Sequence, residues 1–343
     1  MLISDQQHPE MRVCEAFLRR AAGLESPFML KGSYVTRQYF ANPADRVPND
    51  LDWLYLDHLP DPAQARQVFN DWVTQVTEQQ LDDGVRFRSF RENAFWRLMD
   101  YAMDDDFPTA NTDLGYWLDD AEAMQEVSLD ISFNLPLSVP GVPLHYTPLR
   151  GTPFVLPHTA PLALQVSWKM HQTLVRPRFK DLFDLLHLLQ HPAFTDDTRR
   201  QALRALVQEC QADGTHLGRA QWLIQGQLAA LFPPPGAATS WAYWRHGTGH
   251  SFQVWDVGRA ASITEASVLP DTLAEFEAQL RSAFQVAGFE QALEELPAAP
   301  NPLRASLAVH TDLRRHQIVE KIDQAATVHW HLLDWLLQLF KRK

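Results

Sequence analysis

Two short motifs near the start of the sequence constrain what this chain can fold into. Lys31-Gly32-Ser33 follows a short apolar run, and Asp50-Leu51-Asp52 begins another apolar segment seventeen residues after the serine. On a β-strand alternate side chains share a face, so Asp50 and Asp52 are expected to point the same way. Gly32 lets the backbone approach a ligand closely, and Ser33 is suited to begin a helix whose N–H groups receive an anion. The sequence thus predicts a strand, a tight turn, a helix and a second strand with two carboxylates on one face.

These carboxylates offer a pair of hard oxygen ligands. Such ligands suit Mg²⁺, which keeps several waters and shares its remaining positions with substrate phosphates. An Asp-x-Asp pair is also common on a solvated strand face or in a turn, so the motif alone does not identify a metal site. Its interpretation depends on what lies further along the chain.

A third acid lies in a well-defined strand pattern at residues 126–133. Val127, Leu129 and Ile131 share one face of this strand, and Asp130 lies on the other. If this strand neighbours the first pair, Asp130 supplies a third carboxylate to the same site. The alternative is a solvent-facing acid on an edge strand.

Length, charge and cysteine content limit the class of protein. At 343 residues the chain has room for two domains, or for one domain with a large helical appendage. A net charge of -12 argues against nonspecific coating of nucleic acid but permits a local basic groove. No run of eighteen apolar residues and no signal-like N-terminus is present, so no membrane association is expected. Cys14 and Cys210 lie too far apart for a zinc-like spacing, and we expect a cytoplasmic protein.

A second cluster of charged residues lies on two predicted helices, 161–175 and 180–189. Lys169 lies beside the apolar stripe of the first, and Asp181 and Asp184 share one side of the second. Burying Asp184 among leucines is costly unless it meets a cation or a hydrogen-bond donor. Lys180 could pair with it for about 0.3–0.5 kcal/mol. Alternatively, Asp184 or Asp181 orients Lys169 toward a nucleotide triphosphate.

The remaining pattern is coarser. We predict helices over 9–22, 33–40, 61–81, 271–289 and 313–340, two helices within 196–231, a strand over 85–90, an irregular acidic loop over 103–120 that includes Asp104-Asp105-Asp106, a hairpin near Gly141 and a loop at His246 and His250. Basic residues form either a local track for an RNA acceptor or ordinary surface positions: Arg86, Arg88, Arg176, Arg178 and Lys180.

Taken in order, these motifs resemble those of the AbiEii/AbiGii toxin-type nucleotidyltransferases, within the DNA polymerase β-like superfamily. The resemblance covers roughly residues 10–195 and includes Gly32-Ser33, Asp50-Leu51-Asp52, Asp130, Lys169 and the run from Arg178 to Leu185. The chain departs from the family pattern before the acids, where Arg46-Val47-Pro48-Asn49-Asp50 stands in place of the common Arg-x-Thr-x-Asp. It also departs after Gly-Ser, where Tyr34-Val35-Thr36-Arg37 replaces small residues.

The resemblance implies an α/β (α+β) fold and metal-dependent transfer of an NMP from an NTP. Residues 1–195 would form a small mixed-sheet core, and residues 196–343 a mainly helical region that recognises an acceptor or partner. By motif match, Asp50, Asp52 and Asp130 would bind Mg²⁺ (or Mn²⁺), and Asp130 would help to activate the attacking hydroxyl. Gly32, Ser33, Lys169 and Asp181 would form the nucleotide-binding set, and Asp184 would complete the catalytic set by holding Lys169 or a neighbouring base.

The resemblance also implies partners. Some members modify the acceptor end of tRNA and act as the toxin of a toxin–antitoxin pair in abortive phage defence, which suggests tRNA or another RNA as acceptor and a cognate antitoxin as partner. Two alternatives remain open. The acidic net charge favours transfer to a small molecule or a protein. A non-catalytic nucleotide-binding regulator is the other alternative, and the intact motif set argues against it.

Overall fold

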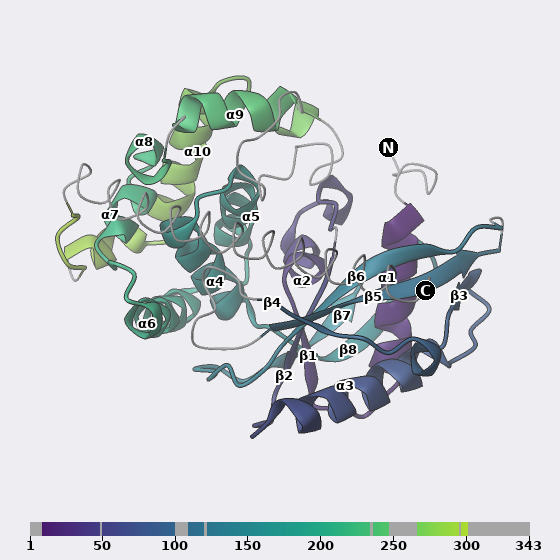
Figure 1. Cartoon of the computed structure of the whole chain (residues 1–343). Helices are drawn as coiled ribbons and strands as arrows, with labels where there is room; N and C mark the ends of the chain where they lie inside the picture. The colour runs from purple at the N-terminus through teal and green to yellow at the C-terminus, as the bar shows by residue number, and fades with distance from the viewer. Residues whose placement is uncertain are drawn as a thin grey trace, which may run out of the picture. The chain divides into compact units, whose positions relative to one another are not determined.

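A mixed β-sheet organises the first half of the chain (Figure 1). The computed structural model describes residues 9–48, 50–99, 109–119, 122–233, 236–246, 266–294 and 296–300. Within these ranges, eight strands form one sheet in the order β3-β5-β6-β2-β1-β8-β7, with β4 paired to β5. The strands are β1 (Phe28–Lys31), β2 (Leu51–Tyr55), β3 (Val85–Phe87), β4 (Arg97–Met99), β5 (Thr109–Leu118), β6 (Gln125–Ser132), β7 (Val142–Tyr146) and β8 (Phe154–Thr159).

Two helices cover one face of this sheet, α1 (Pro9–Ala22) and α3 (Pro62–Thr77). Trp72 of α3 stacks on Phe28 of β1 with ring centroids 3.9 Å apart, and Trp53 of β2 meets the same indole edge-on. The side chains of Leu51 and Trp53 are therefore buried in this core. Because side chains alternate along a strand, Asp52 faces the opposite side of the sheet.

The second half of the described chain is helical. Its helices are α4 (Leu162–Val175), α5 (Phe179–Gln190), α6 (Asp196–Asp213), α7 (Arg219–Ile224), α8 (Leu228–Leu231), α9 (Ala237–His246) and α10 (Leu273–Val286). α4 packs against α5 and α6, and an aromatic group centred on Phe179 joins α5 to α9 and α10. The described residues between 9 and 299 belong to one compact unit. The domain boundary predicted at residue 195 stays a prediction. None of the described helices is long and apolar enough to cross a membrane.

The strands and helices that carry the motifs match the sequence-based prediction. Strands occupy 28–31, 51–55 and 125–132, and α4 and α5 begin where predicted. The helix predicted from Ser33 is shorter, because α2 (Ser33–Thr36) gives way to a 3-10 turn (Arg37–Tyr39). The mixed sheet with flanking helices confirms the predicted α+β class.

The irregular loop predicted over 103–120 is wrong for residues 109–118. This segment is β5, which pairs with β6 over residues 109–116 while Leu114, Tyr116 and Leu118 turn into the core. Those three residues alternate as a strand requires, but the preceding acids outweighed this signal in our interpretation. The run Asp104-Asp105-Asp106 lies outside the described residues.

Smaller differences concern segment ends. The β7–β8 hairpin closes over residues 147–153 and not near Gly141. Residues 196–231 form three helices because Gly214 and Gly226, both with positive φ, end the first two. The strand predicted over 85–90 ends at Phe87, and His246 ends α9 instead of lying in a loop. The predicted helix at 313–340 and His250 lie outside the described residues.

Candidate active site

Three carboxylates meet where two parallel strands lie side by side. The register of β2 and β6 places Asp52 directly opposite Asp130, and Asp50 lies one residue before β2 begins. Oxygen atoms of the three side chains all lie within 4.8 Å of one another. Hard oxygen donors in a half-buried cluster fit a divalent cation such as Mg²⁺. The sequence-predicted acids are thus brought together as a set.

The three neighbouring carboxylates of this cluster repel one another when all are ionised. Burial, reinforced by Asp50 and Asp130, raises the pKa of Asp52 to about 6, and Lys31 offsets part of this effect. Lys31 is paired with Asp52 across β1 and β2, and its Nζ lies 3.6 Å from Asp52 Oδ1. Sequence analysis named Lys31 only as part of the Gly-Ser motif. Lys31 ends β1 immediately before Gly32, and this position in the motif is what places it opposite Asp52.

Gly32 makes room for one of these acids. Its backbone has φ 73° and ψ −155°, a region that is essentially restricted to glycine. A Cβ at this position would lie 2.2 Å from Asp52 Oδ2. We predicted that Gly32 would allow close approach to a phosphate, and the structure adds that it allows close approach of Asp52. Ser33 follows with a buried hydroxyl that has no hydrogen-bond partner among the described residues.

Lys169 is held by the two predicted acids of α5. Its Nζ lies 2.6 Å from Asp181 Oδ1 and 2.9 Å from Asp184 Oδ2. Burial alone would lower the pKa of Lys169, but the two carboxylates outweigh it and hold that pKa above its usual value. The structure therefore places Lys169 beside both acids, and its orientation toward a triphosphate stays a prediction. In the described chain, Asp184 contacts Lys169 and a distant arginine instead of Lys180 on its own helix.

That arginine is Arg46, which precedes the acidic motif. Its Nε donates to Asp184 Oδ1 at 2.7 Å, and its Nη1 donates to the carbonyl of Val47 at 2.7 Å. Both Arg46 and Asp184 are buried, and burial would raise the pKa of Asp184, but Arg46 and Lys169 hold it below its usual value. Arg178 pairs with Asp181 in the same way. Sequence analysis cited Arg46 only as part of a departure from the family pattern.

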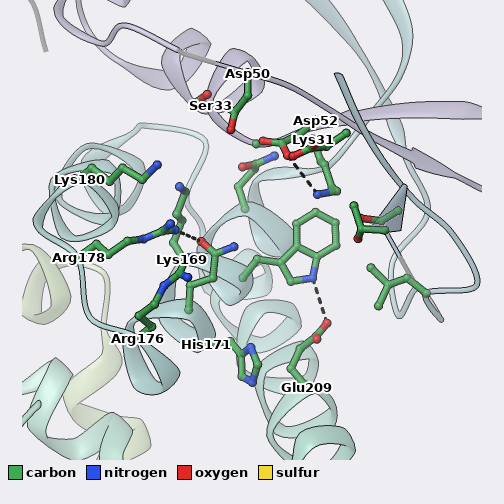
Figure 2. Close-up of a pocket in the computed structure, with 18 of the residues that line it drawn as sticks. Lys31, Ser33, Asp50, Asp52, Lys169, His171, Arg176, Arg178, Lys180 and Glu209 are labelled. Carbon is green, nitrogen blue, oxygen red and sulfur yellow. Dashed lines mark hydrogen bonds and ion pairs between the residues drawn. The ribbon is translucent and has the colours of Figure 1, made fainter. Parts of the chain in front are cut away.

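A cavity of about 180 Å³ joins these groups (Figure 2). The three acids, Gly32 and Ser33 line it from the sheet side, and Lys169 lines it from α4. Asp181 and Asp184 are fully buried and lie behind Lys169, outside the cavity lining. Both act on the cavity through the cations they hold. Their assignment to the nucleotide-binding and catalytic sets stays a prediction.

The predicted basic track divides into two groups. Arg176, Arg178 and Lys180 line the cavity opposite the acids, where Figure 2 shows them together. Arg86 instead stacks over Trp117 at 4.5 Å, and Arg88 pairs with Glu92, toward the far end of β5 from the site. Arg86 and Arg88 therefore lie outside the cavity lining, and a local basic track for an RNA acceptor stays a prediction.

An asparagine missed by sequence analysis positions Asp130. Asn111 of β5 donates to Asp130 Oδ1, and its own Oδ1 accepts from Arg97 Nε at 2.9 Å. Arg97 thereby fixes which end of the amide faces Asp130. The residue was missed because its segment was interpreted as a loop. Other cavity-lining residues also escaped prediction, namely Leu135, Gln165, Trp168, His171, Gln172 and Glu209.

A family model described as nucleotidyl transferase AbiEii toxin, type IV toxin–antitoxin system, matches residues 16–308. No curated protein matches the chain.

Among solved structures, the chain is similar to JHP933 from Helicobacter pylori, at 14% identity over 85% of this chain and 95% of that one, with a TM-score of 0.45. It is also similar to MenT4, a nucleotidyltransferase toxin from Mycobacterium tuberculosis H37Rv, at 15% identity over 90% and 92%, with a TM-score of 0.46. Because the family model spans most of the sequence, the chain belongs to the AbiEii family of nucleotidyltransferase toxins from type IV toxin–antitoxin systems, and it is a nucleotidyltransferase.

Proposed function

We propose that this enzyme transfers an NMP from an NTP to an RNA acceptor, with tRNA as the acceptor to test first. It would do so with Mg²⁺ (or Mn²⁺), in the cytoplasm, as the toxin of a pair used in phage defence and restrained by a cognate antitoxin. The observation that carries this proposal is one cavity with three carboxylates on the sheet side and a group of Lys and Arg side chains on the helix side. A metal–triphosphate complex carries both charges that this arrangement complements.

The acids have distinct proposed roles. Asp50, Asp52 and Asp130 hold the cation, which when bound neutralises phosphate charge and orients the reacting oxygens. Asp130 also accepts the proton of the acceptor hydroxyl, since Asn111 fixes its orientation from the side. The hydroxyl oxygen then forms a bond to the α-phosphorus, the bond to the β-phosphate oxygen breaks, and pyrophosphate leaves. No covalent intermediate with the protein is required.

The helix side stabilises the triphosphate. Lys169 neutralises charge that develops on the leaving pyrophosphate, and the buried Asp181 and Asp184 keep its ammonium group in place. Lys169 is therefore a catalytic residue in this proposal, and the two aspartates are positioning residues. Gly32 and Ser33 line the sheet side of the cavity and receive phosphate oxygens, with the Ser33 hydroxyl, which has no partner among the described residues, available as a donor.

Arg176, Arg178 and Lys180 line the cavity, where their positive charge suits the triphosphate and also an anionic acceptor such as RNA. The net charge of -12 favours a smaller or protein acceptor, so the test includes these acceptors. The experiment supplies each of four α-labelled NTPs with Mg²⁺ to total RNA, to a protein extract and to a small-molecule extract. Label in a tRNA-sized band is the expected result.

The matched variants are Asp52→Asn, which removes a proposed metal ligand, and Asp197→Asn, which alters an exposed aspartate on α6. The first is expected to abolish labelling and the second to leave it unchanged. If label enters only protein or a small molecule, the acceptor is that protein or small molecule and not RNA. If no fraction is labelled although the protein binds Mg²⁺-NTP, the transfer proposal fails and a binding role remains.

A further inference from the structure

One wall of the cavity is neither acidic nor basic. Trp168 of α4 and Leu135, which follows β6, are both half-buried and line the cavity. Both pack on a small apolar group formed by Met29, Leu54 and Ala160. Among the lining residues in the described ranges, Trp168 alone is a Trp, Tyr or Phe. This apolar surface offers no charge or hydrogen bond to the triphosphate proposed above.

The indole of Trp168 is held in place from outside the sheet. Its Nε1–H donates to Glu209 Oε1 of α6 at 3.0 Å, which Figure 2 draws as a dashed line. Using the only polar atom of the indole in this bond leaves the ring as an apolar surface. A fixed aromatic ring on a cavity wall is suited to stack against a flat ligand.

Gln165 supplies a second, independent observation. It lies on α4 one turn before Trp168, lines the cavity and is 1% exposed. Its Oε1 lies 2.8 Å from the Thr36 hydroxyl, while its Nε2 has no hydrogen-bond partner in the described chain. An unpaired buried donor costs about 1–3 kcal/mol. A ligand oxygen in the cavity would satisfy this amide.

These groups adjoin the proposed phosphate site, and Gln165 bonds to Thr36, whose hydroxyl also donates to the carbonyl of Gly32 at 3.0 Å. Trp168 immediately precedes Lys169, so the apolar wall and the triphosphate lysine share one turn of α4. In Figure 2, Glu209 and His171 lie on the opposite side of the pocket from Asp50 and Ser33. The cavity lining therefore places one apolar wall, Trp168 and Leu135, beside the lysine that is proposed to bind the triphosphate.

We propose that Trp168 and Leu135 form the subsite for the nucleobase of the incoming NTP, with Trp168 as a stacking platform and Gln165 donating to an oxygen of the nucleoside. This inference rests on the proposed function for the identity of the ligand. Every base has a π-face, and base–aromatic stacking contributes about 1–3 kcal/mol per base. The subsite therefore binds all four NTPs, and Glu209 acts as a positioning residue for the indole.

The test compares NTPs with inorganic tripolyphosphate, which lacks a base and a sugar. Calorimetric dissociation constants with Mg²⁺ are measured for the intact protein and for Trp168→Ala, Trp168→Phe and Gln165→Leu. Trp168→Ala is expected to weaken NTP binding roughly 5- to 150-fold and to leave tripolyphosphate binding unchanged. Trp168→Phe is expected to recover most of the loss, and Gln165→Leu is expected to weaken only NTP binding. Trp117→Ala, which removes a tryptophan that stacks with Arg86 far from the site, is the matched control.

Three results would overturn the subsite. Equal loss of NTP and tripolyphosphate binding in Trp168→Ala would mean that the indole only supports Lys169. Equal affinity of the intact protein for both ligands would mean that the base is not recognised. Unchanged NTP binding with a raised KM for RNA would assign the wall to the acceptor. Trp168-dependent NTP binding without nucleotide transfer would leave the subsite standing and refute the proposed reaction alone.

Discussion

Substituting Gly32 by alanine tests whether the glycine serves the acid beside it. The new Cβ would lie 2.2 Å from Asp52 Oδ2, 2.9 Å from Asp52 Cβ and 3.0 Å from Asp52 Cγ. Rotating the carboxylate does not relieve the clash, because the base of the side chain is also too close. Oδ2 must retreat to at least 3.0 Å, so the metal-binding geometry changes by about 0.8 Å. A misplacement of about 1 Å at a reacting centre costs roughly 100-fold in rate.

The backbone adds a separate penalty. At φ 73° and ψ −155° an alanine is strained by about 1–3 kcal/mol, so Gly32→Ala is also expected to lower Tm. Gly214 provides the matched control, because its φ is +74° and a Cβ added there would meet no atom within 4 Å. Because Gly214 has ψ 12° and lies in the left-handed helical region, Gly214→Ala should lower Tm by less than Gly32→Ala, without changing kcat/KM or the Mg²⁺ requirement. The reasoning is refuted if Gly32→Ala keeps kcat/KM within about threefold of the intact enzyme, or if Gly214→Ala loses as much activity.

Three further perturbations follow from the site. Asn111→Leu removes the amide donor to Asp130 and is expected to lower kcat roughly 10- to 100-fold with NTP affinity unchanged, as steady-state kinetics and calorimetry would report. Burial and the neighbouring Arg178 lower the pKa of Lys180 to about 8, so NTP affinity should fall as pH rises from about 7 to 9, and Lys180→Arg should remove that fall. In the unfolded chain Lys180 keeps its proton to higher pH than in the folded chain. The free energy of unfolding is therefore expected to increase as pH rises above about 8. Arg46→Ala leaves the buried Asp184 with Lys169 alone and should reduce the free energy of unfolding by about 3 kcal/mol in urea titrations, and a change below about 1 kcal/mol would contradict the pairing.

The motifs with local spacing were predictable from the sequence. Alternation places Asp50 and Asp52 on one face and Asp130 opposite an apolar face, because a strand has a period of two regardless of its neighbours. The pairing of β2 with β6 joins residues far apart in the sequence, which local alternation does not determine. The sequence therefore predicted only that Asp130 joins the acidic pair if the two strands are neighbours. Asn111 shows the limit, because its role depends on β5 lying beside β6, and the acids before it obscured the strand pattern.

The partner of Asp184 shows why the rest of the site was not predictable. Burial cost required a cation for this acid, and the sequence offered Lys180 and Lys169 as candidates. The structure supplies Lys169 together with Arg46, which is 138 positions away along the chain. Arg46 also lies four residues before Asp50, at the start of the loop that leads into β2.

One buried carboxylate on α5, that of Asp184, therefore restrains both the lysine proposed to bind the triphosphate and the loop that carries Asp50 to the proposed metal site. This shared restraint predicts that Asp184→Asn weakens Mg²⁺ and tripolyphosphate binding together. Asp181 forms its ion pairs within the described chain with Lys169 and Arg178, so Asp181→Asn is expected to weaken tripolyphosphate binding alone. Equal effects of both variants on Mg²⁺ binding would show that the Arg46 contact does not organise the acidic loop.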